Sequence, residues 1–168
     1  MMGKAPYRIG VLSDTHGHLP ARVLEIFEGV DMILHAGDVG RDDLLIELEA
    51  LAPTLAVSGN MDGAPDERTR PLVRQIETPV GKIAMTHGHL ATAPSNNPAR
   101  MASRFAEFGP DIIIFGHSHA PHLSRVGTVW VFNPGTAGQA RFGKGPSVGL
   151  ITAGEDGPRF EHVMIETM

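Results

Sequence analysis

The first third of the chain alternates between short apolar segments and segments with helical periodicity. The apolar segments predict three buried strands, at residues 7–13, 32–34 and 54–57. Between them, residues 20–29 and 42–51 repeat apolar side chains at helical spacing, starting at Pro20 and at the helix-capping Asp42. We expect the second helix to bury Leu44, Leu45, Leu48 and Leu51. Strands that alternate with helices predict parallel βαβ units.

The second half of the chain changes character. Residues 73–78 and 82–86 predict a hairpin, because a Pro-Val-Gly turn separates them. The Asn-Pro pair at residues 97–98 begins a further helix, which is expected to end at Gly109. Further strands are predicted at residues 111–115, 122–126, 128–133, 147–153 and 160–165. Since no repeat, linker or charge block interrupts this pattern, we expect residues 1–168 to form a single α/β domain with mixed sheets.

Composition narrows the class of protein. A chain of 168 residues suits one domain, and 42% hydrophobic with 20% charged residues is typical of a soluble globular protein. The net charge of −5 argues against non-specific nucleic-acid binding, which needs a basic face. No apolar run approaches the ~18 residues of a membrane span. Residues 1–6 lack the apolar core of a signal peptide, so we expect a cytoplasmic protein without membrane association.

Histidine and cysteine usage points to the type of chemistry. The chain has nine His and no Cys, which excludes disulfides and thiolate metal sites. If the surplus histidines bind metal, their co-ligands must therefore be oxygen donors. Five polar clusters follow predicted strands: Asp14-Thr-His16, Gly37-Asp38, Gly59-Asn60, Thr86-His87-Gly-His89 and Gly116-His117-Ser-His119.

These clusters are expected to meet, because sites in open α/β sheets lie beyond the carboxyl ends of the strands. Residues two apart in an extended segment point to the same side, so Asp14 and His16 could hold one ion, as could His117 and His119. Carboxylate, imidazole and amide donors together suit Mn, Fe, Zn or similar ions better than Ca or Mg alone.

Each cluster also has a simpler interpretation. An isolated Asp-x-His is more often a turn with a cap, Gly-Asp and Gly-Asn are common turn dipeptides, and His-x-His occurs in other metallohydrolases. Chance explains the pieces separately but is a poor account of all five at strand ends. Three histidines, His35, His122 and His162, are expected to be structural or exposed, and His18 is left undecided.

The ordered motifs Asp14-x-His16, Gly37-Asp38, Gly59-Asn60, His87 and Gly116-His117-x-His119 resemble those of the calcineurin-like metallophosphoesterase superfamily. The turn Asn133-Pro-Gly-Thr136 and the downstream Arg141 resemble its small bacterial and archaeal phosphodiesterase subfamily. The resemblance implies a four-layer αββα sandwich of two mixed sheets flanked by helices. It also implies the following ligands: Asp14, His16 and His119 for a first metal, Asn60, His87 and His117 for a second, and Asp38 as the bridge.

The resemblance further implies an enzyme. We expect a dinuclear metal-dependent phosphoesterase, foremost a phosphodiesterase, in which a metal-bridging hydroxide attacks phosphorus in line. Two divalent ions per chain are expected, with Mn first and Fe, Zn, Ni or Co as alternatives. The substrate would be a small phosphoester, nucleotide-like esters included. The alternatives are a phosphomonoesterase, another His-x-His metallohydrolase, or a non-catalytic scaffold, since a subunit of the eukaryotic retromer coat shares this fold.

The chain departs from the family pattern at Met61. Many relatives carry His directly after the motif Asn and others carry Cys, whereas Met cannot donate a proton. The acid role would then move to His89 or His18, or the enzyme would favour substrates with good leaving groups. Asp62 could orient the loop or the substrate. Arg141 has two interpretations that we weigh equally, a phosphate clamp and a solvated loop residue.

Partners are less well specified. The apolar segment at residues 129–132, which includes Trp130, could form an oligomer interface or the inner face of a sheet. We favour the inner face, although homo-oligomers are common in this family.

Overall fold

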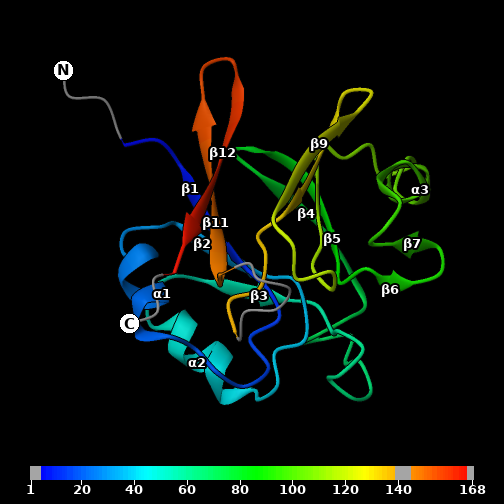
Figure 1. Cartoon of the computed structure of the whole chain (residues 1–168). Coiled ribbons are helices and arrows are strands. Elements are labelled where there is room, and N and C mark those ends of the chain that lie inside the picture. Colours follow the sequence, from blue (N-terminus) through cyan, green and yellow to red (C-terminus); the bar gives the residue numbers. More distant parts are fainter. Residues whose placement is uncertain (1–4, 139–144, 166–168) are drawn as a thin grey trace.

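The computed structural model describes residues 5–138 and 145–165 (Figure 1). These residues form three helices: α1 (Ala21–Ile26), α2 (Asp43–Glu49) and α3 (Pro98–Arg104). The strands of a first sheet are β1 (Arg8–Leu12), β2 (Met32–His35), β3 (Thr54–Ala56), β11 (Ser147–Gly154) and β12 (Gly157–Met164). Those of a second sheet are β4 (Val73–Thr78), β5 (Gly81–Thr86), β8 (Ile112–Ile114), β9 (His122–Val126) and β10 (Val129–Asn133).

Both sheets are mixed, as expected. The first has the strand order β12-β11-β1-β2-β3 and the second β4-β5-β8-β10-β9. Strands β1, β2 and β3 run parallel to one another, as do β5, β8 and β10, while the outer hairpin partners are antiparallel. The predicted βαβ units and the predicted hairpin of β4 and β5 are therefore confirmed.

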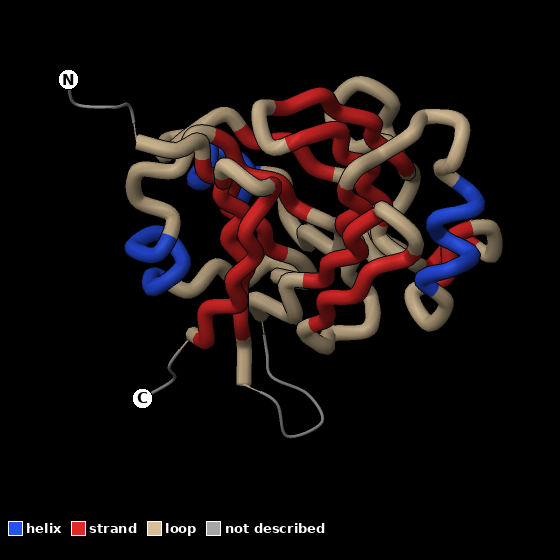
Figure 2. The backbone as a smooth tube through the Cα atoms, turned by 90° about the horizontal axis from the view of Figure 1, so that it is seen from above, coloured by secondary structure: helices blue, strands red, loops and turns tan. Residues whose placement is uncertain are grey.

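Three apolar clusters separate four layers. One cluster packs α1 and α2 against the first sheet and includes Phe27 and Leu48. A second fills the space between the two sheets with side chains such as Ile9 and Ile112. The third packs α3 on the outer face of the second sheet through Phe105. Figures 1 and 2 show the resulting order, with helices on both outer sides and the strands between them. The expected αββα sandwich is confirmed.

Some details differ from the predicted elements. Helix α3 ends at Arg104 rather than at Gly109, because the chain continues in single turns with i to i+3 hydrogen bonds, such as Gly109 N–H to the Ala106 carbonyl. Leu51 is 37% exposed, since α2 ends two residues before it and the helical register stops. The small sheet of β6 (His89–Leu90) and β7 (Ala93–Pro94) was not predicted.

The segment around Trp130 lies in the sandwich. Val131 and Phe132 are fully buried, and the Trp130 ring packs against Phe160 of the first sheet with 5.4 Å between the ring centroids. The inner-face interpretation therefore holds for Trp130 and Phe132, whereas Val129 and Val131 pack on the other face of the sheet, toward α3. Among the described residues, no helix has both the length and the apolar character needed to cross a bilayer.

Candidate metal centre

Five loops converge at one end of the sandwich. They follow β1, β2, β3, β5 and β8, which are the strands whose parallel pairing brings their carboxyl ends to the same edge. The seven predicted metal ligands lie on these loops: Asp14, His16, Asp38, Asn60, His87, His117 and His119. Residues from distant parts of the sequence thus meet where the resemblance requires a metal site.

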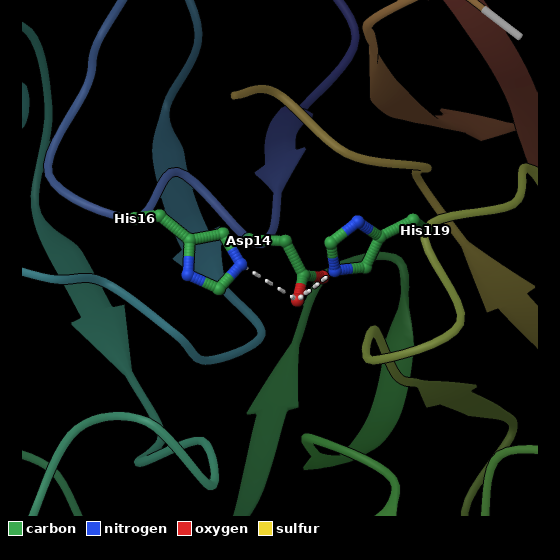
Figure 3. Close-up of side chains that lie close together, drawn as sticks. All are labelled: Asp14, His16 and His119. Atoms are coloured by element: carbon green, nitrogen blue, oxygen red, sulfur yellow. Dashed lines mark ion pairs between the residues drawn. The ribbon is translucent and has the colours of Figure 1, made fainter. Parts of the chain in front are cut away.

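Asp14, His16 and His119 form a first cluster around the Asp14 carboxylate. His119 Nε2 lies 3.2 Å and His16 Nε2 3.8 Å from Asp14 Oδ1. Figure 3 shows the two imidazole rings reaching this oxygen from opposite sides. The three ligand atoms are close enough to hold a single ion.

Asp38 and His87 form a second, buried cluster with the same Asp14 carboxylate. His87 Nε2 lies 3.2 Å from Asp38 Oδ2 and 3.7 Å from Asp14 Oδ1. His87 Nδ1 lies 2.7 Å from the Ala36 carbonyl, which can only accept a hydrogen bond. Because Nδ1 is the donor there, Nε2 of the neutral ring is free to bind a cation.

Asn60 and His117 complete the set on the open side. His117 Nδ1 lies 3.1 Å from Asn60 Oδ1, and the His117 and His87 ring centroids are 5.1 Å apart. A pocket of about 330 Å³ opens beside them and is lined by His16, Asp38, Asn60, Met61, His117 and His119. The two clusters thus border one pocket that a small ligand could enter.

The backbone of these loops is unusual. In the described part of the chain, the non-glycine residues with positive φ are Asp14, His16, Asp38, His117 and His119. All five are predicted ligands. A left-handed conformation costs an L-residue roughly 1–2 kcal/mol, so the fold holds these side chains against a local preference. Neighbouring glycines permit the crowding, since a side chain at Gly59 would collide with Asp38.

Electrostatics keep both carboxylates ionised. Burial alone would raise the pKa of Asp14, but contact with His119 and the charge of His87 bring it below its ordinary value. For Asp38, contact with His87 overcomes burial and lowers the pKa to about 2. Burial lowers the pKa of His87, yet contact with Asp38 and the nearby carboxylates raise it overall. These negative charges attract a proton to His87, and a divalent cation would satisfy them in its place.

Unpaired buried atoms support a metal at this position. Asp14 Oδ1 and His87 Nε2 are buried, and neither forms a hydrogen bond with any residue that the structure describes. Buried polar atoms are normally paired, and a carboxylate oxygen and an imidazole nitrogen that lack hydrogen bonds and lie 3.7 Å apart fit the binding of a cation between them. The mixed oxygen and imidazole donor set suits Mn, Fe or Zn.

His35 braces the centre without facing the pocket. Its Nδ1 accepts a hydrogen bond from Gly37 N–H, and its Nε2 lies 2.9 Å from Thr15 Oγ1, which in turn donates to the Val39 carbonyl. Burial lowers the pKa of His35 to about 4, so the ring is neutral as this network requires. The expected structural role agrees with this geometry.

Asn133 and Thr136 hold two of the ligand loops from β10. Asn133 Nδ2 donates to the Gly116 carbonyl and to Ser118 Oγ, on either side of His117. Thr136 Oγ1 donates to the Asp14 carbonyl. The Asn-Pro-Gly turn therefore supports two of the loops that carry the predicted ligands.

Among the other predicted site residues, Asp62 is internal. Its two carboxylate oxygens accept hydrogen bonds from Gly40 N–H and Gly59 N–H, and its side chain is not exposed. This geometry fits the loop-orienting role and leaves neither oxygen facing the pocket. His89 is half-buried behind His87, with a ring centroid distance of 5.5 Å, whereas His18 is exposed. Arg141 lies outside the described residues.

Sequence reasoning missed some contributors. Ser13 Oγ donates to Asp14 Oδ2, and Thr15 links the first ligand loop to His35. A local signal existed, because both are small hydroxyl residues that flank a ligand. Thr136 belongs to the Asn133-Pro-Gly-Thr136 turn that the sequence singled out, but no local pattern indicated its contact with Asp14, 122 residues away.

Known proteins resemble this chain in sequence. The model for the calcineurin-like phosphoesterase superfamily domain matches residues 7–156. The chain is 34% identical over 164 residues to a probable metallophosphoesterase of Methanothermobacter thermautotrophicus, with 95% of this chain and 92% of that protein covered. It is 32% identical over 163 residues to phosphodiesterase YfcE of Escherichia coli, with coverages of 83% and 84%.

Solved structures agree with the architecture. Vacuolar protein sorting 29 of Cryptosporidium parvum superposes with a TM-score of 0.77 at 18% identity, covering 98% of this chain and 100% of that one. At this identity the likeness speaks for the fold alone. Together with the sequence match and the converging loops, the finding is clear: the chain belongs to the calcineurin-like phosphoesterase superfamily.

Proposed function

We propose that this protein is a dinuclear metal-dependent phosphodiesterase. The observation that carries the proposal is the buried cluster of Asp14, Asp38 and His87, in which Asp14 Oδ1 and His87 Nε2 lack hydrogen bonds with the described residues and lie 3.7 Å apart. A relative with 32% identity bears the name phosphodiesterase, which favours diesters as the substrate class.

Two cations would divide the seven ligands. We assign Asp14, His16 and His119 to one and Asn60, His87 and His117 to the other, with Asp38 shared between them. The Asp14 carboxylate also lies near His87, so it contributes charge to both positions. When bound, two divalent ions, Mn²⁺ foremost, would polarise a phosphate and lower the pKa of a water for in-line attack on phosphorus.

The protein's own residues would orient the substrate. The pocket beside His16, Asn60 and His117 is the entry for the phosphate. The side chain of Met61 cannot donate a proton to the leaving alcohol. His89 stays a sequence-based candidate for a hydrogen bond to the substrate; its ring centroid lies 6.4 Å from that of His117, and it is not among the described residues that line the pocket. His18 and Arg141 stay sequence-based predictions for contacts to the substrate.

The test uses an aryl diester and a matched ligand variant. Metal-free protein is reloaded with Mn²⁺, and hydrolysis of bis(p-nitrophenyl) phosphate is compared between the wild type and Asp38→Asn. We expect metal-dependent activity in the wild type and its loss in the variant. Equal rates for the two proteins would overturn the proposal. p-Nitrophenyl phosphate, measured on the same preparation, separates a diesterase from a phosphomonoesterase.

A non-catalytic scaffold is the second candidate, because vacuolar protein sorting 29 shares the fold. The complete donor set favours the enzyme, since a scaffold has no need for strained, buried ligands. Metal analysis after purification with Mn²⁺ tests the scaffold in one direction only, because vacuolar protein sorting 29 of Entamoeba histolytica has been solved with Zn²⁺. Well below one ion per chain would support the scaffold.

A further inference from the structure

Met61 is an exposed apolar side chain in an otherwise polar pocket. It is 69% exposed, whereas Met85 and Met101 are fully buried in the core. Of the six described residues that line the pocket, the other five are predicted metal ligands. An exposed apolar side chain is ordinary on a surface. At the mouth of this pocket, however, Met61 adds a flexible aliphatic contact surface beside the polar side chains of the predicted ligands.

The backbone of Met61 is held in place. Its N–H donates to Asp38 Oδ1 over 2.8 Å. The next residue, Asp62, is internal and ties the loop to Gly40 and Gly59 through both carboxylate oxygens. The Met61 side chain therefore starts from a fixed point beside a predicted ligand. Its own flexible, polarisable thioether remains free to adapt to what binds there.

We infer that Met61 is the apolar wall that receives the non-leaving ester group of the substrate. The site would accordingly favour phosphodiesters in which that group is an aromatic ring or another large apolar group. This inference rests on the proposed phosphodiesterase function and adds to it the class of the second ester group.

The choice of the non-leaving group follows from charge. Negative charge develops on the leaving oxygen during hydrolysis, and that oxygen needs a donor or a cation beside it. A thioether and two methylene groups supply neither. The group that stays on phosphorus does not change its charge, so an apolar wall can contact it throughout the reaction. Sulfur–aromatic contacts further favour a ring over a small alkyl group.

The test holds the leaving group constant. Phenyl p-nitrophenyl phosphate and methyl p-nitrophenyl phosphate both release p-nitrophenolate and differ in the retained group. Both are assayed with the Mn²⁺-loaded wild type, Met61→Ala and Met61→Leu. Met164→Ala is the matched control, because Met164 is also an exposed methionine, at 49%, and lies at the end of β12.

In Met61→Ala we expect kcat/KM for the phenyl ester to fall about 3- to 10-fold, mostly through KM. The fall for the methyl ester should be at least about threefold smaller, Met61→Leu should keep most of the wild-type preference, and Met164→Ala should match the wild type. The Kd for Mn²⁺ should not change in Met61→Ala.

Two results would overturn the role of Met61: equal changes for both esters, or weaker Mn²⁺ binding in Met61→Ala. If the loaded wild type hydrolyses neither ester, the proposed function itself fails, and that outcome is distinct from both.

Discussion

The turns at the two ends of the sandwich differ in which residue types adopt positive φ. At the end where β1 and β5 begin, hairpin turns use glycines with positive φ, such as Gly127 and Gly157, and a Cβ there would meet nothing within 4 Å. At the other end, in the loops that carry the predicted ligands, non-glycine residues such as Asp14 and His117 also have positive φ. Figure 1 shows two of these hairpins, β9–β10 and β11–β12, projecting away from the ligand loops.

The difference fits the proposed metal site at one end and plain chain reversals at the other. A hairpin turn needs only a reversal of direction, and glycine makes it without strain. A ligand loop needs an imidazole or a carboxylate at a position where the backbone turns sharply. Glycine cannot supply that side chain, so the residue bears the energetic cost of positive φ, and surrounding contacts offset it. His35, Asp62 and Asn133 supply those contacts through hydrogen bonds to the loops. Residues at the two ends should therefore respond differently to the same kind of substitution.

The largest contrast is expected between two aspartates. Asp38→Asn removes a charge from the centre, and diester hydrolysis by the Mn²⁺-loaded protein should fall more than about 100-fold. Asp156→Asn makes the same change at the β11–β12 turn, where Asp156 is exposed, and activity should stay within about twofold. Steady-state kinetics measure both. Similar losses of activity in the two variants would mean that the charge of Asp38 has no particular role in hydrolysis.

A smaller effect is expected from residues that support the ligand loops through hydrogen bonds. Asn133→Ala removes the donors to the Gly116 carbonyl and Ser118 Oγ, so the His117 loop should loosen and the Kd for Mn²⁺ should rise about 10- to 100-fold. The control is Thr78→Ala, which removes a hydroxyl that braces the β4–β5 turn. Metal titration well below each variant's Tm should show no change in Thr78→Ala. An unchanged Kd in Asn133→Ala would remove that residue from the support of the site.

Acid should weaken the site end through His35. Its folded pKa of about 4 lies below the unfolded value of about 6.5, so only the unfolded chain binds the proton between these pH values. His35 should therefore contribute a fall of about 3 kcal/mol to the free energy of unfolding of the metal-free protein as pH drops from 6.5 to 4, while His87, whose folded pKa is raised, contributes in the opposite direction. Asp38, with its pKa of about 2, adds a further loss only below about pH 4.

Denaturant titrations across this range measure the slope. His35→Gln should flatten it, whereas His122→Gln, at a partly buried histidine whose pKa burial also lowers, should change it less. A slope that is identical in the wild type and His35→Gln would contradict the assignment of a neutral, buried ring.

The smallest effect concerns backbone strain itself. His16→Gly should be more stable than His16→Ala by about 1 kcal/mol, because glycine relieves the positive φ of 48°. Gly127→Ala should destabilise the protein by about the same amount. The cause would be the positive φ at this position, because an added Cβ would meet no atom within 4 Å. Thermal unfolding of the metal-free proteins compares the three variants. If His16→Ala were as stable as His16→Gly, the strain at the ligand loop would be negligible.

The fold was largely predictable because its strands are short apolar runs bounded by glycine and polar turns. The segment of β8, with three isoleucines, and the hairpin of β4 and β5 carry that signal locally. The end of α3 could not be predicted from such a signal, because Met101, Phe105 and Phe108 keep helical spacing although the helix ends at Arg104. Periodicity reports which side chains are buried, and single turns can bury them as a helix does.

The site divides in the same way. The ligand motifs could be read because each places its residues within a few positions of a strand end. The contacts that support them join distant positions, such as Asn133 with Gly116 and Asp62 with Gly40, and no local pattern encodes them. The positive φ of Asp14 and His117 was equally hidden, because Asp and His adopt it more often than other non-glycine residues but still only in a small minority of cases.

The most direct test of the central claim is an anomalous difference map from crystals grown with Mn²⁺, recorded at the manganese absorption edge. Two peaks about 3.5–4 Å apart are predicted, one beside Asp14, His16 and His119 and the other beside Asn60, His87 and His117, with Asp38 between them. Peaks elsewhere, or none at this end of the sandwich in a crystal saturated with Mn²⁺, would contradict the dinuclear centre.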